Sequence, residues 1–412
     1  MMVRMRLYLQ ILRYRPAQLL LLGSAPARLA YAMISLGIYF RVYHAVGSIS
    51  VAGLAVGLNG LAGAFTAGIR ASMIDRFGLI WPLALLVPGY ATMIVLFNYS
   101  HGRNLLLAFA FVLGLSAPPI NLSVRPMWKS TVPPDWLRAT FAVDTASMGI
   151  TAVIGPVLAT TLALSTIPSA ALNVCAAAMV VGGVALLVQK ATRLWVPEAK
   201  EKNAVPIWKS SAIRLLMLEG CFIGLGVGAF DIGVPATTTL HHVASRTGYI
   251  LGIMATFNIA GSLLAGLAAK HLPPLRAFRR VYLLWVVLSF PMAFVSPNWT
   301  MFAISAGIGL CGGALHVFYF EITEAVRPKG AAAGAIGLLW TVEGTMNACG
   351  TAVGGYLAQH FGPRWCFVLD AICVTIGFAI IDRNKKRLAA ANNVTSSRVD
   401  LDALDDVASH DR

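Results

Sequence analysis

Long stretches of apolar residues recur along the whole chain, separated by short segments rich in charge, proline or glycine. A helix needs about 20 mostly apolar residues to cross a bilayer. Twelve stretches meet this length, over residues 18–42, 48–69, 79–98, 104–127, 139–162, 168–189, 212–239, 247–269, 279–297, 299–322, 330–357 and 363–382. The pattern therefore predicts an all-α integral membrane protein with twelve transmembrane helices.

The composition favours a membrane protein over a soluble one. The 412 residues are 58% hydrophobic and 12% charged, and the mean hydropathy is +0.73. Soluble domains contain about 45–50% apolar and about 25% charged residues, so this chain has too little polar surface for two or three soluble domains. The same numbers exclude a disordered chain, a collagen and a disulfide scaffold.

The basic excess could indicate a nucleic-acid-binding protein, since 32 Lys and Arg stand against 17 Asp and Glu, for a net charge of +15. The basic residues instead alternate along the chain, and nearly all of them, Arg70 and Arg76 among them, fall in connections on the side of the N-terminus. The exceptions are Arg28 inside the first span and, on the opposite side, Arg41, Arg103, Arg246 and Arg364. Because cytoplasmic loops retain Lys and Arg, we expect a multi-pass protein of the cytoplasmic (inner) membrane with both termini in the cytoplasm and no nucleic-acid partner.

The chain divides into two halves of six spans. The longest internal connection, about residues 190–211, is polar and charged. We expect the following domains: a basic cytoplasmic N-terminus over 1–17, six-helix bundles over 18–190 and 212–385, a cytoplasmic linker over 191–211, and a disordered cytoplasmic tail over 386–412.

Spans five and eleven carry an internal repeat. Residues 149–163, GITAVIGPVLATTLA, align with residues 344–358, GTMNACGTAVGGYLA, at an offset of 195. The matched glycines are Gly149 with Gly344 and Gly155 with Gly350. Small residues at this spacing let helices approach closely in lipid, so these glycines predict helix packing at interfaces and two pseudo-symmetric bundles.

The connection after span two resembles a family signature. Residues 71–78, ASMIDRFG, are similar to the Gly-x-x-x-Asp-Arg-x-Gly motif of the major facilitator superfamily, with Ala71 in place of the first glycine. Gly155-Pro156 in span five is similar to a motif of its exporter branches. Further segments resemble an actinobacterial-type branch, namely residues 47–53, 118–128 and 137–144. The resemblance implies a secondary transporter that alternates access around a midplane cavity; we expect it to be monomeric.

The resemblance also implies a conformational gate at Asp75, Arg76 and Gly78. In the family, this aspartate docks against the N-terminus of span eleven, here near residues 330–333. Free N–H groups and the helix dipole make such an end attractive to an anion. The alternative is an ordinary solvated loop acid beside Arg76.

Five acidic residues fall inside predicted spans, namely Asp144, Glu219, Asp231, Glu343 and Asp370. A charge at the centre of a membrane helix costs at least about 2.5–3.5 kcal/mol, so such residues usually face a water-filled path or lie near an interface. Asp144 fits an interfacial position. Glu343 is near the middle of its span and is a candidate for binding a proton or substrate, with a buried structural hydrogen bond as the alternative.

Span eleven has a polar and small-residue face at helical spacing. Its members are Trp340, Glu343, Gly344, Asn347, Thr351 and Gly354. We expect this face to line a central route or the seam between the halves.

Two further candidate pairs come from matched spans. Arg28 in span one and Asp231 in span seven could pair across the cavity, and protonation of Asp231 would then release Arg28 for an anionic group. His316 in span ten lies 195 residues after Asn121 in span four. Histidine titrates near neutral pH and can relay protons, although a satisfied core histidine is the alternative.

Signals for enzymes and metals are missing from the sequence. The six cysteines lie in predicted spans without a C-x-x-C motif, and neither a P-loop nor H-E-x-x-H occurs. We therefore predict no metal, no cofactor and no enzymatic activity, but a proton-coupled exporter of a drug or metabolite. The alternatives are a proton symporter or facilitator for uptake of a sugar, organic acid or amino acid, and an integral-membrane enzyme or receptor.

Overall fold

The computed structural model describes residues 9–133, 136–194, 210–268, 274–326 and 332–390. In the first half the helices are α2 (Arg15–Val46), α3 (Ile49–Phe77), α4 (Ile80–Tyr99), α5 (Arg103–Leu115), α6 (Ile120–Thr131), α7 (Leu137–Ala163), α8 (Ala170–Leu187) and α9 (Lys190–Leu194). In the second half they are α10 (Ser211–Leu240), α11 (Arg246–Ala268), α12 (Pro274–Met292), α13 (Trp299–Val326), α14 (Ala332–His360), α15 (Arg364–Arg383) and α16 (Lys385–Ala390).

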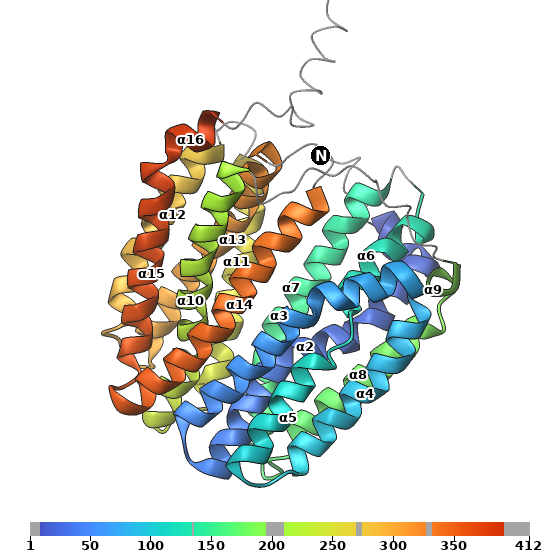
Figure 1. The fold of residues 1–412 in the computed structure, drawn as a ribbon, viewed down its shortest axis with the longest axis horizontal. Coiled ribbons are helices and arrows are strands. Elements are labelled where there is room, and N and C mark those ends of the chain that lie inside the picture. Colours follow the sequence, from blue (N-terminus) through green and yellow to red (C-terminus); the bar gives the residue numbers. More distant parts are fainter. Residues whose placement is uncertain (1–8, 134–135, 195–209, 269–273, 327–331, 391–412) are drawn as a thin grey trace, which may run out of the picture.

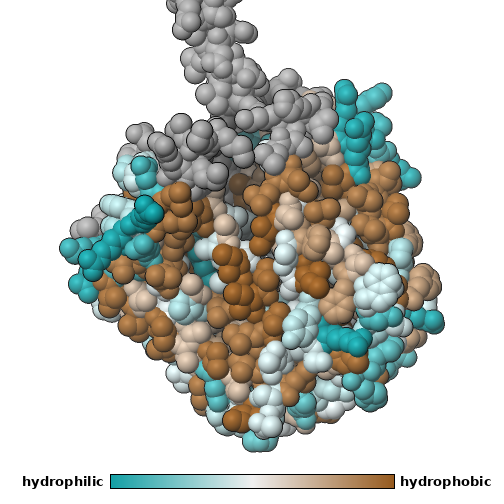
Figure 2. All heavy atoms as spheres, turned by 180° about the vertical axis from the view of Figure 1, so that it is seen from behind, coloured by the Kyte–Doolittle hydropathy of each residue, from teal (hydrophilic) through white to brown (hydrophobic). Residues whose placement is uncertain are grey.

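The described helices correspond to the twelve predicted spans. Nine of them are long and apolar enough to cross a membrane, and the other three predicted spans are the pair α5–α6, α12 and α14. Apolar side chains cover much of the face shown in Figure 2. Many large apolar side chains are exposed, with Leu22 at 72% and Phe294 at 82%. A large exposed apolar surface marks contact with lipid or with another protein.

The fourth predicted span is not one continuous helix. α5 ends at Leu115 and α6 begins at Ile120. Pro118 and Pro119 have no N–H to donate, and each disfavours the helical conformation for the residue before it. Two successive prolines therefore interrupt the helix at mid-span, which is more than the kink that one proline causes.

The helices form two bundles with the same internal packing. In Figure 1, α2 to α8 (blue to green) make one bundle and α10 to α15 (yellow-green to red) make the other. α2 packs on α7 and α8 as α10 packs on α14 and α15, α3 packs on α5 as α11 packs on α13, and α4 packs on α8 as α12 packs on α15. The predicted pair of pseudo-symmetric bundles is confirmed.

Close contacts within the bundles repeat at the predicted offset of 195 residues. A Cβ added at Gly114 would lie 2.2 Å from the carbonyl oxygen of Asn59, and one added at Gly309 would lie 2.1 Å from that of Met254. Both pairs need a residue without a side chain, because helix backbones touch there. The repeat thus extends from sequence to packing.

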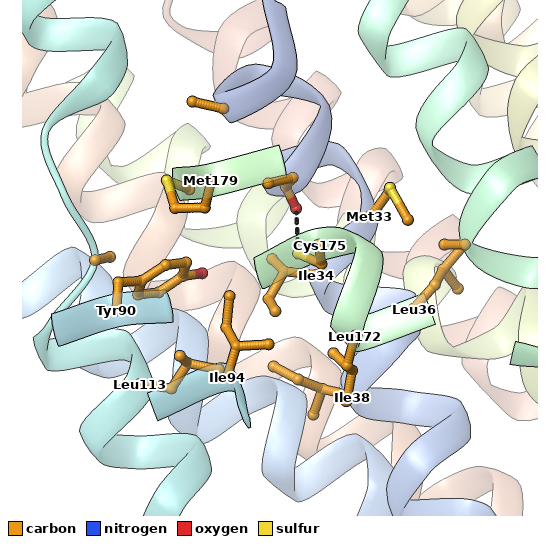
Figure 3. Close-up of a cluster of buried hydrophobic side chains, with 14 of the residues drawn as sticks. Met33, Ile34, Leu36, Ile38, Tyr90, Ile94, Leu113, Leu172, Cys175 and Met179 are labelled. Carbon is orange, nitrogen blue, oxygen red and sulfur yellow. Dashed lines mark hydrogen bonds between the residues drawn. The ribbon is translucent and has the colours of Figure 1, made fainter. Parts of the chain in front are cut away.

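The core of the first bundle is built by α2, α4, α5 and α8. Figure 3 shows side chains from these helices converging, among them Met33, Tyr90 and Met179. The Sγ of Cys175 donates a hydrogen bond to the carbonyl oxygen of Ala30 at 3.1 Å. This buried cysteine ties α8 to α2.

The bundles meet along two seams, α3 with α14 and α7 with α11. In the first seam, a Cβ on Gly53 would lie 2.7 Å from the Cα of Gly355. In the second, a Cβ on Gly248 would lie 2.7 Å from the carbonyl oxygen of Pro156. Both seams are in close contact toward the end of the molecule that holds the connections 47–48 and 361–363, which we call the closed end.

The seam between α3 and α14 separates toward the opposite end of the molecule. A Cβ on Gly60 would still lie 3.3 Å from the Cβ of Ala348, but one on Gly68, Gly337 or Gly344 would meet no atom of the described residues within 4 Å. Figure 1 shows the two helices together at the closed end and apart at the other. We call the other end, where α3 ends and α10 begins, the open end.

Candidate functional site

Asp231 and Asn347 lie where the two bundles begin to separate. The side-chain amide of Asn347 donates to Oδ2 of Asp231 at 3.3 Å, which links α14 to α10. A Cβ on Gly228 would lie 2.0 Å from the carbonyl oxygen of Asn347, so these helices touch through backbone. Ala348 follows Asn347 on α14 and makes the contact with Gly60 beyond which α3 and α14 separate toward the open end. Asp231 and Asn347 therefore lie where the space between the bundles begins.

Asp370 is a second carboxyl group near Asp231. It lies on α15, is 2% exposed, and its Oδ1 has no hydrogen-bond partner among the described residues. The two carboxyl groups interact electrostatically. Two nearby carboxylates repel each other, and a buried carboxylate without a hydrogen-bond partner is costly.

Glu219 and Glu343 form a second acidic pair closer to the open end. The hydroxyl of Tyr282 donates to Oε1 of Glu219 at 2.9 Å, and both side chains are buried. Glu343 is half-buried and interacts electrostatically with Glu219 and with the exposed His316. The Nδ1 of His316 lies 2.9 Å from the carbonyl oxygen of Gly312. Sequence reasoning did not identify Tyr282, because no motif marks a phenol that faces an acid on another helix.

All four of these carboxyl groups belong to the second bundle. Within the described residues, none of them forms an ion pair with Lys or Arg. A buried carboxylate without a cationic partner is costly. The arrangement can therefore bind protons, or a cation that reaches it from the open end.

Arg28 pairs with Asp144, and the predicted contact with Asp231 is not formed. The Nη2 of Arg28 lies 2.8 Å from Oδ1 of Asp144, and each side chain is 2% exposed. The Nη1 also donates to Oγ of Ser147 at 2.8 Å. The tight packing of α2 on α7 buries both charges between the two helices, and the interfacial position expected for Asp144 stays a prediction.

Arg70 lies inside a helix, and the expectation that it belongs to a loop is wrong. α3 continues to Phe77, so Arg70 falls two turns before its end. The Nη1 donates to the carbonyl oxygen of Ala117 at 2.7 Å and the Nη2 to that of Gly63 at 2.5 Å. The sequence signal that could have found it is Gly78, which caps α3 eight residues later.

A pocket of about 290 Å³ lies beside Arg70, between α2, α3, α4 and the interrupted span. Asn59 and Asn121 also line it. Asn121 and His316, the pair matched by sequence, thus have different surroundings, one beside a guanidinium and the other beside an acid.

The predicted gate is only partly described. The side chain of Asp75 and residues 327–331, which include part of its proposed docking site, lie outside the described residues, so the gate stays a prediction. Gly78 has φ +75° and donates its N–H to Ile74, which ends α3. The guanidinium of Arg76 lies 5.4 Å from the ring centroid of Phe77.

The matched glycines and the proline serve different contacts. A Cβ on Gly155 would lie 2.4 Å from the Cβ of Ala32, and one on Gly350 would lie 2.1 Å from the carbonyl oxygen of Leu225, both within a bundle. Gly149 and Pro156 face α11 across the seam, with Gly149 near Ile259. A Cβ on Gly344 would meet no atom of the described residues within 4 Å, so this glycine is not at a tight contact.

Part of the predicted face of span eleven lies in the seam between the halves, where a Cβ on Gly57 would lie 3.0 Å from Oγ1 of Thr351. Thr351 is buried, and Gly354 packs on Ala229 of α10. Trp340 is half-exposed, with its ring centroid 6.0 Å from that of Phe320. Only Glu343 and Asn347 hold the positions that a polar route from the open end would reach.

The described residues contain no group of three or more His, Cys, Asp and Glu side chains placed to hold a metal ion.

Comparison with known proteins gives a family match over most of the chain. The model described as Major Facilitator Superfamily matches residues 20–344 and 220–397. The MFS-type transporter poxA of Penicillium oxalicum is 29% identical over 198 residues, which are 45% of this chain and 34% of that protein. The match therefore spans about a third of the length of that relative.

Several solved structures share the fold. The nucleoside transporter NupG has a TM-score of 0.71 at 10% identity and covers 92% of this chain and 100% of its own. A bacterial homologue of the iron transporter ferroportin in the inward-facing state has a TM-score of 0.71 at 15% identity. The match covers 90% of this chain and 98% of that one. A bacterial homologue of the human lysosomal transporter Spinster, in an inward-facing and occupied conformation, has a TM-score of 0.73 at 14% identity. The match covers 90% of this chain and 97% of that one. The two-bundle fold and the family match together show that the chain belongs to the major facilitator superfamily, a family of multi-pass membrane transporters.

Proposed function

We propose that this secondary transporter couples the export of a small molecule across the cytoplasmic membrane to the movement of protons. The observation that carries the proposal is the set of four carboxyl groups in the second bundle that form no ion pair with Lys or Arg among the described residues: Glu219, Asp231, Glu343 and Asp370. Transporters of this kind use intramembrane acids as proton sites.

The half-buried Glu343 and Asp231 are the acids that a proton from the open end would reach first. If the bundles closed at that end, both carboxyl groups would lose contact with water. Enclosing a charged carboxylate costs several kcal/mol, so protonation favours closure and deprotonation favours reopening. This difference in free energy supplies the coupling between proton binding and alternating access.

The predicted topology gives this cycle a direction. With both termini in the cytoplasm, the open end faces the cytoplasm and the closed end faces outside. Export is favoured by the resemblance of Gly155-Pro156 to exporter motifs, in a segment that packs closely on Ala32 of α2.

The proposal predicts that an imposed pH gradient changes flux in proteoliposomes. A panel that includes nucleosides, organic acids and lipophilic cations identifies a substrate first. We expect wild-type flux to follow the sign of the gradient, and Glu343→Gln and Asp231→Asn each to lose most of this response, because neither amide can carry the proton.

Asp382→Asn is the matched control, since Asp382 pairs with Arg279 at the edge of the second bundle, away from the acidic pairs. It should keep the response of the wild type. Flux that ignores the gradient in the wild type, or a response that survives in both test variants, would contradict proton coupling.

A further inference from the structure

We propose that the pocket at the interruption of the fourth span binds an anionic group of the transported molecule, a carboxylate or phosphate, through Arg70. The proposal rests on the proposed function in one respect, namely that the bound anion belongs to the molecule that is transported. The site lies in the first bundle, apart from the four carboxyl groups of the second.

The charge of Arg70 is not neutralised by any described side chain. Arg28, the other arginine deep within the first bundle, has Asp144 at 2.8 Å. Arg70 instead contacts only the carbonyl oxygens of Ala117 and Gly63, and its Nε is buried without a partner among the described residues. A half-buried cation without a counter-charge is costly, so an entering anion would be stabilised there.

Arg70 keeps donors available for a ligand. A guanidinium has five N–H groups, and two of them are used by Ala117 and Gly63. The carbonyl oxygen of Pro118 is held separately, by the hydroxyl of Tyr31. The hydrogen bonds to these two carbonyl oxygens thus use only part of the guanidinium. Its planar arrangement of N–H groups suits carboxylate and phosphate oxygens.

The pocket has the size and the access that a small ligand needs. Its volume of about 290 Å³ is near the lower end of small-molecule sites, and Tyr31, Asn59 and Asn121 line it beside Arg70. Gly60 lines it too, and a Cβ on Gly60 would lie 3.3 Å from that of Ala348 in the other bundle. The pocket therefore reaches the seam between the bundles.

The test measures how the pocket discriminates reagent charge, with a cysteine as reporter. Asn121→Cys places a thiol at an exposed position on the pocket wall. Purified protein is treated with an anionic reagent, sulfonatoethyl methanethiosulfonate, or a cationic one, trimethylammonioethyl methanethiosulfonate, and wild type gives the background of the native thiols. We expect the anionic reagent to be favoured, and the ratio of rates to fall about tenfold or more with Arg70→Gln but not with Arg70→Lys.

His316→Cys is the matched control reporter, because it lies at the same repeat position of the second bundle, is exposed, and faces Glu343. There the cationic reagent should be favoured, and Arg70→Gln should change nothing. A ratio at Asn121→Cys that does not respond to Arg70→Gln would overturn the proposal. Thermal unfolding of each variant confirms that it is folded.

Protection assays then distinguish the two anion chemistries. Benzoate protecting Asn121→Cys supports a carboxylate, inorganic phosphate protecting it supports a phosphate, and benzyl alcohol is the uncharged control. Protection by neither anion, or equal protection by benzyl alcohol, would show that the pocket does not bind anionic groups. None of these measurements uses a pH gradient, so their failure leaves proton coupling intact, and a failure of proton coupling leaves them intact.

Discussion

Gly53→Val is expected to open the closed end. A cysteine on α14 that is buried against Gly53 should then be labelled about tenfold faster. The added Cβ alone would lie 2.7 Å from the Cα of Gly355 and 2.8 Å from the carbonyl oxygen of Thr351, and both of these atoms are backbone. Overpacking a tight contact costs about 1–3 kcal/mol, and 1.4 kcal/mol is tenfold in a population. The reporter is Thr351→Cys, which is 3% exposed in this state.

Gly68→Val is the control on the same helix, because a Cβ there meets no described atom within 4 Å. It should label like the parent, even though it adds the same side chain to α3. Equal labelling of Gly53→Val and Gly68→Val would show that the glycine contact does not hold the bundles together.

Arg28→Met is expected to lower the free energy of unfolding by about 3–5 kcal/mol, since removing one partner leaves the other as a lone buried charge. The remaining carboxylate of Asp144 would be 2% exposed and without its guanidinium. The double variant Arg28→Met/Asp144→Leu replaces both charges by apolar groups and should recover most of the loss. Thermal unfolding in detergent measures all three proteins.

The competing pairing gives a clear contrast. Arg28→Met/Asp231→Leu should recover nothing, because Asp231 is bonded to Asn347 on another helix. Recovery with Asp231→Leu and none with Asp144→Leu would mean that the ion pair of this structure is not the one that stabilises the protein.

The helices and their arrangement could be predicted from the sequence, because membrane spans are encoded locally. Each needs only a run of apolar residues between polar boundaries. The repeat was visible in Gly155 and Gly350, and the structure shows the reason, since both lie where backbones touch within a bundle. Such contacts exclude side chains, so their glycines recur in both halves.

The interruption of span four and the position of Arg70 were harder to predict. Hydropathy continues across Pro118 and Pro119, so the run reads as one span although its backbone breaks there. Arg70 reads as a loop residue because a charge usually ends a span. Its guanidinium donates to the carbonyl oxygen of Ala117, which lies in the interruption between α5 and α6, and to that of Gly63 on α3 itself. A backbone acceptor leaves no mark in the sequence.

The partner of Arg28 could not be predicted for a different reason. Depth in the membrane follows from residue number, and it places Arg28 near the middle of its span and Asp231 in the outer half of its own. The actual partner depends on how α2 and α7 are rotated against each other, which is set by contacts such as that of Gly155 with Ala32. The periodicity of a single helix carries no information on that rotation.

The most direct test of proton-driven alternating access is a pair of distance measurements between spin labels at the two ends of the molecule. Labels replace the exposed His44 and His360 at the closed end, or Phe77 and Arg214 at the open end, after Cys221 and Cys349 are changed to serine. We predict that acidification lengthens the closed-end distance and shortens the open-end distance, and that Glu343→Gln with Asp231→Asn removes this response. Distances that do not respond to pH, or that change in the same direction at both ends, would contradict the account.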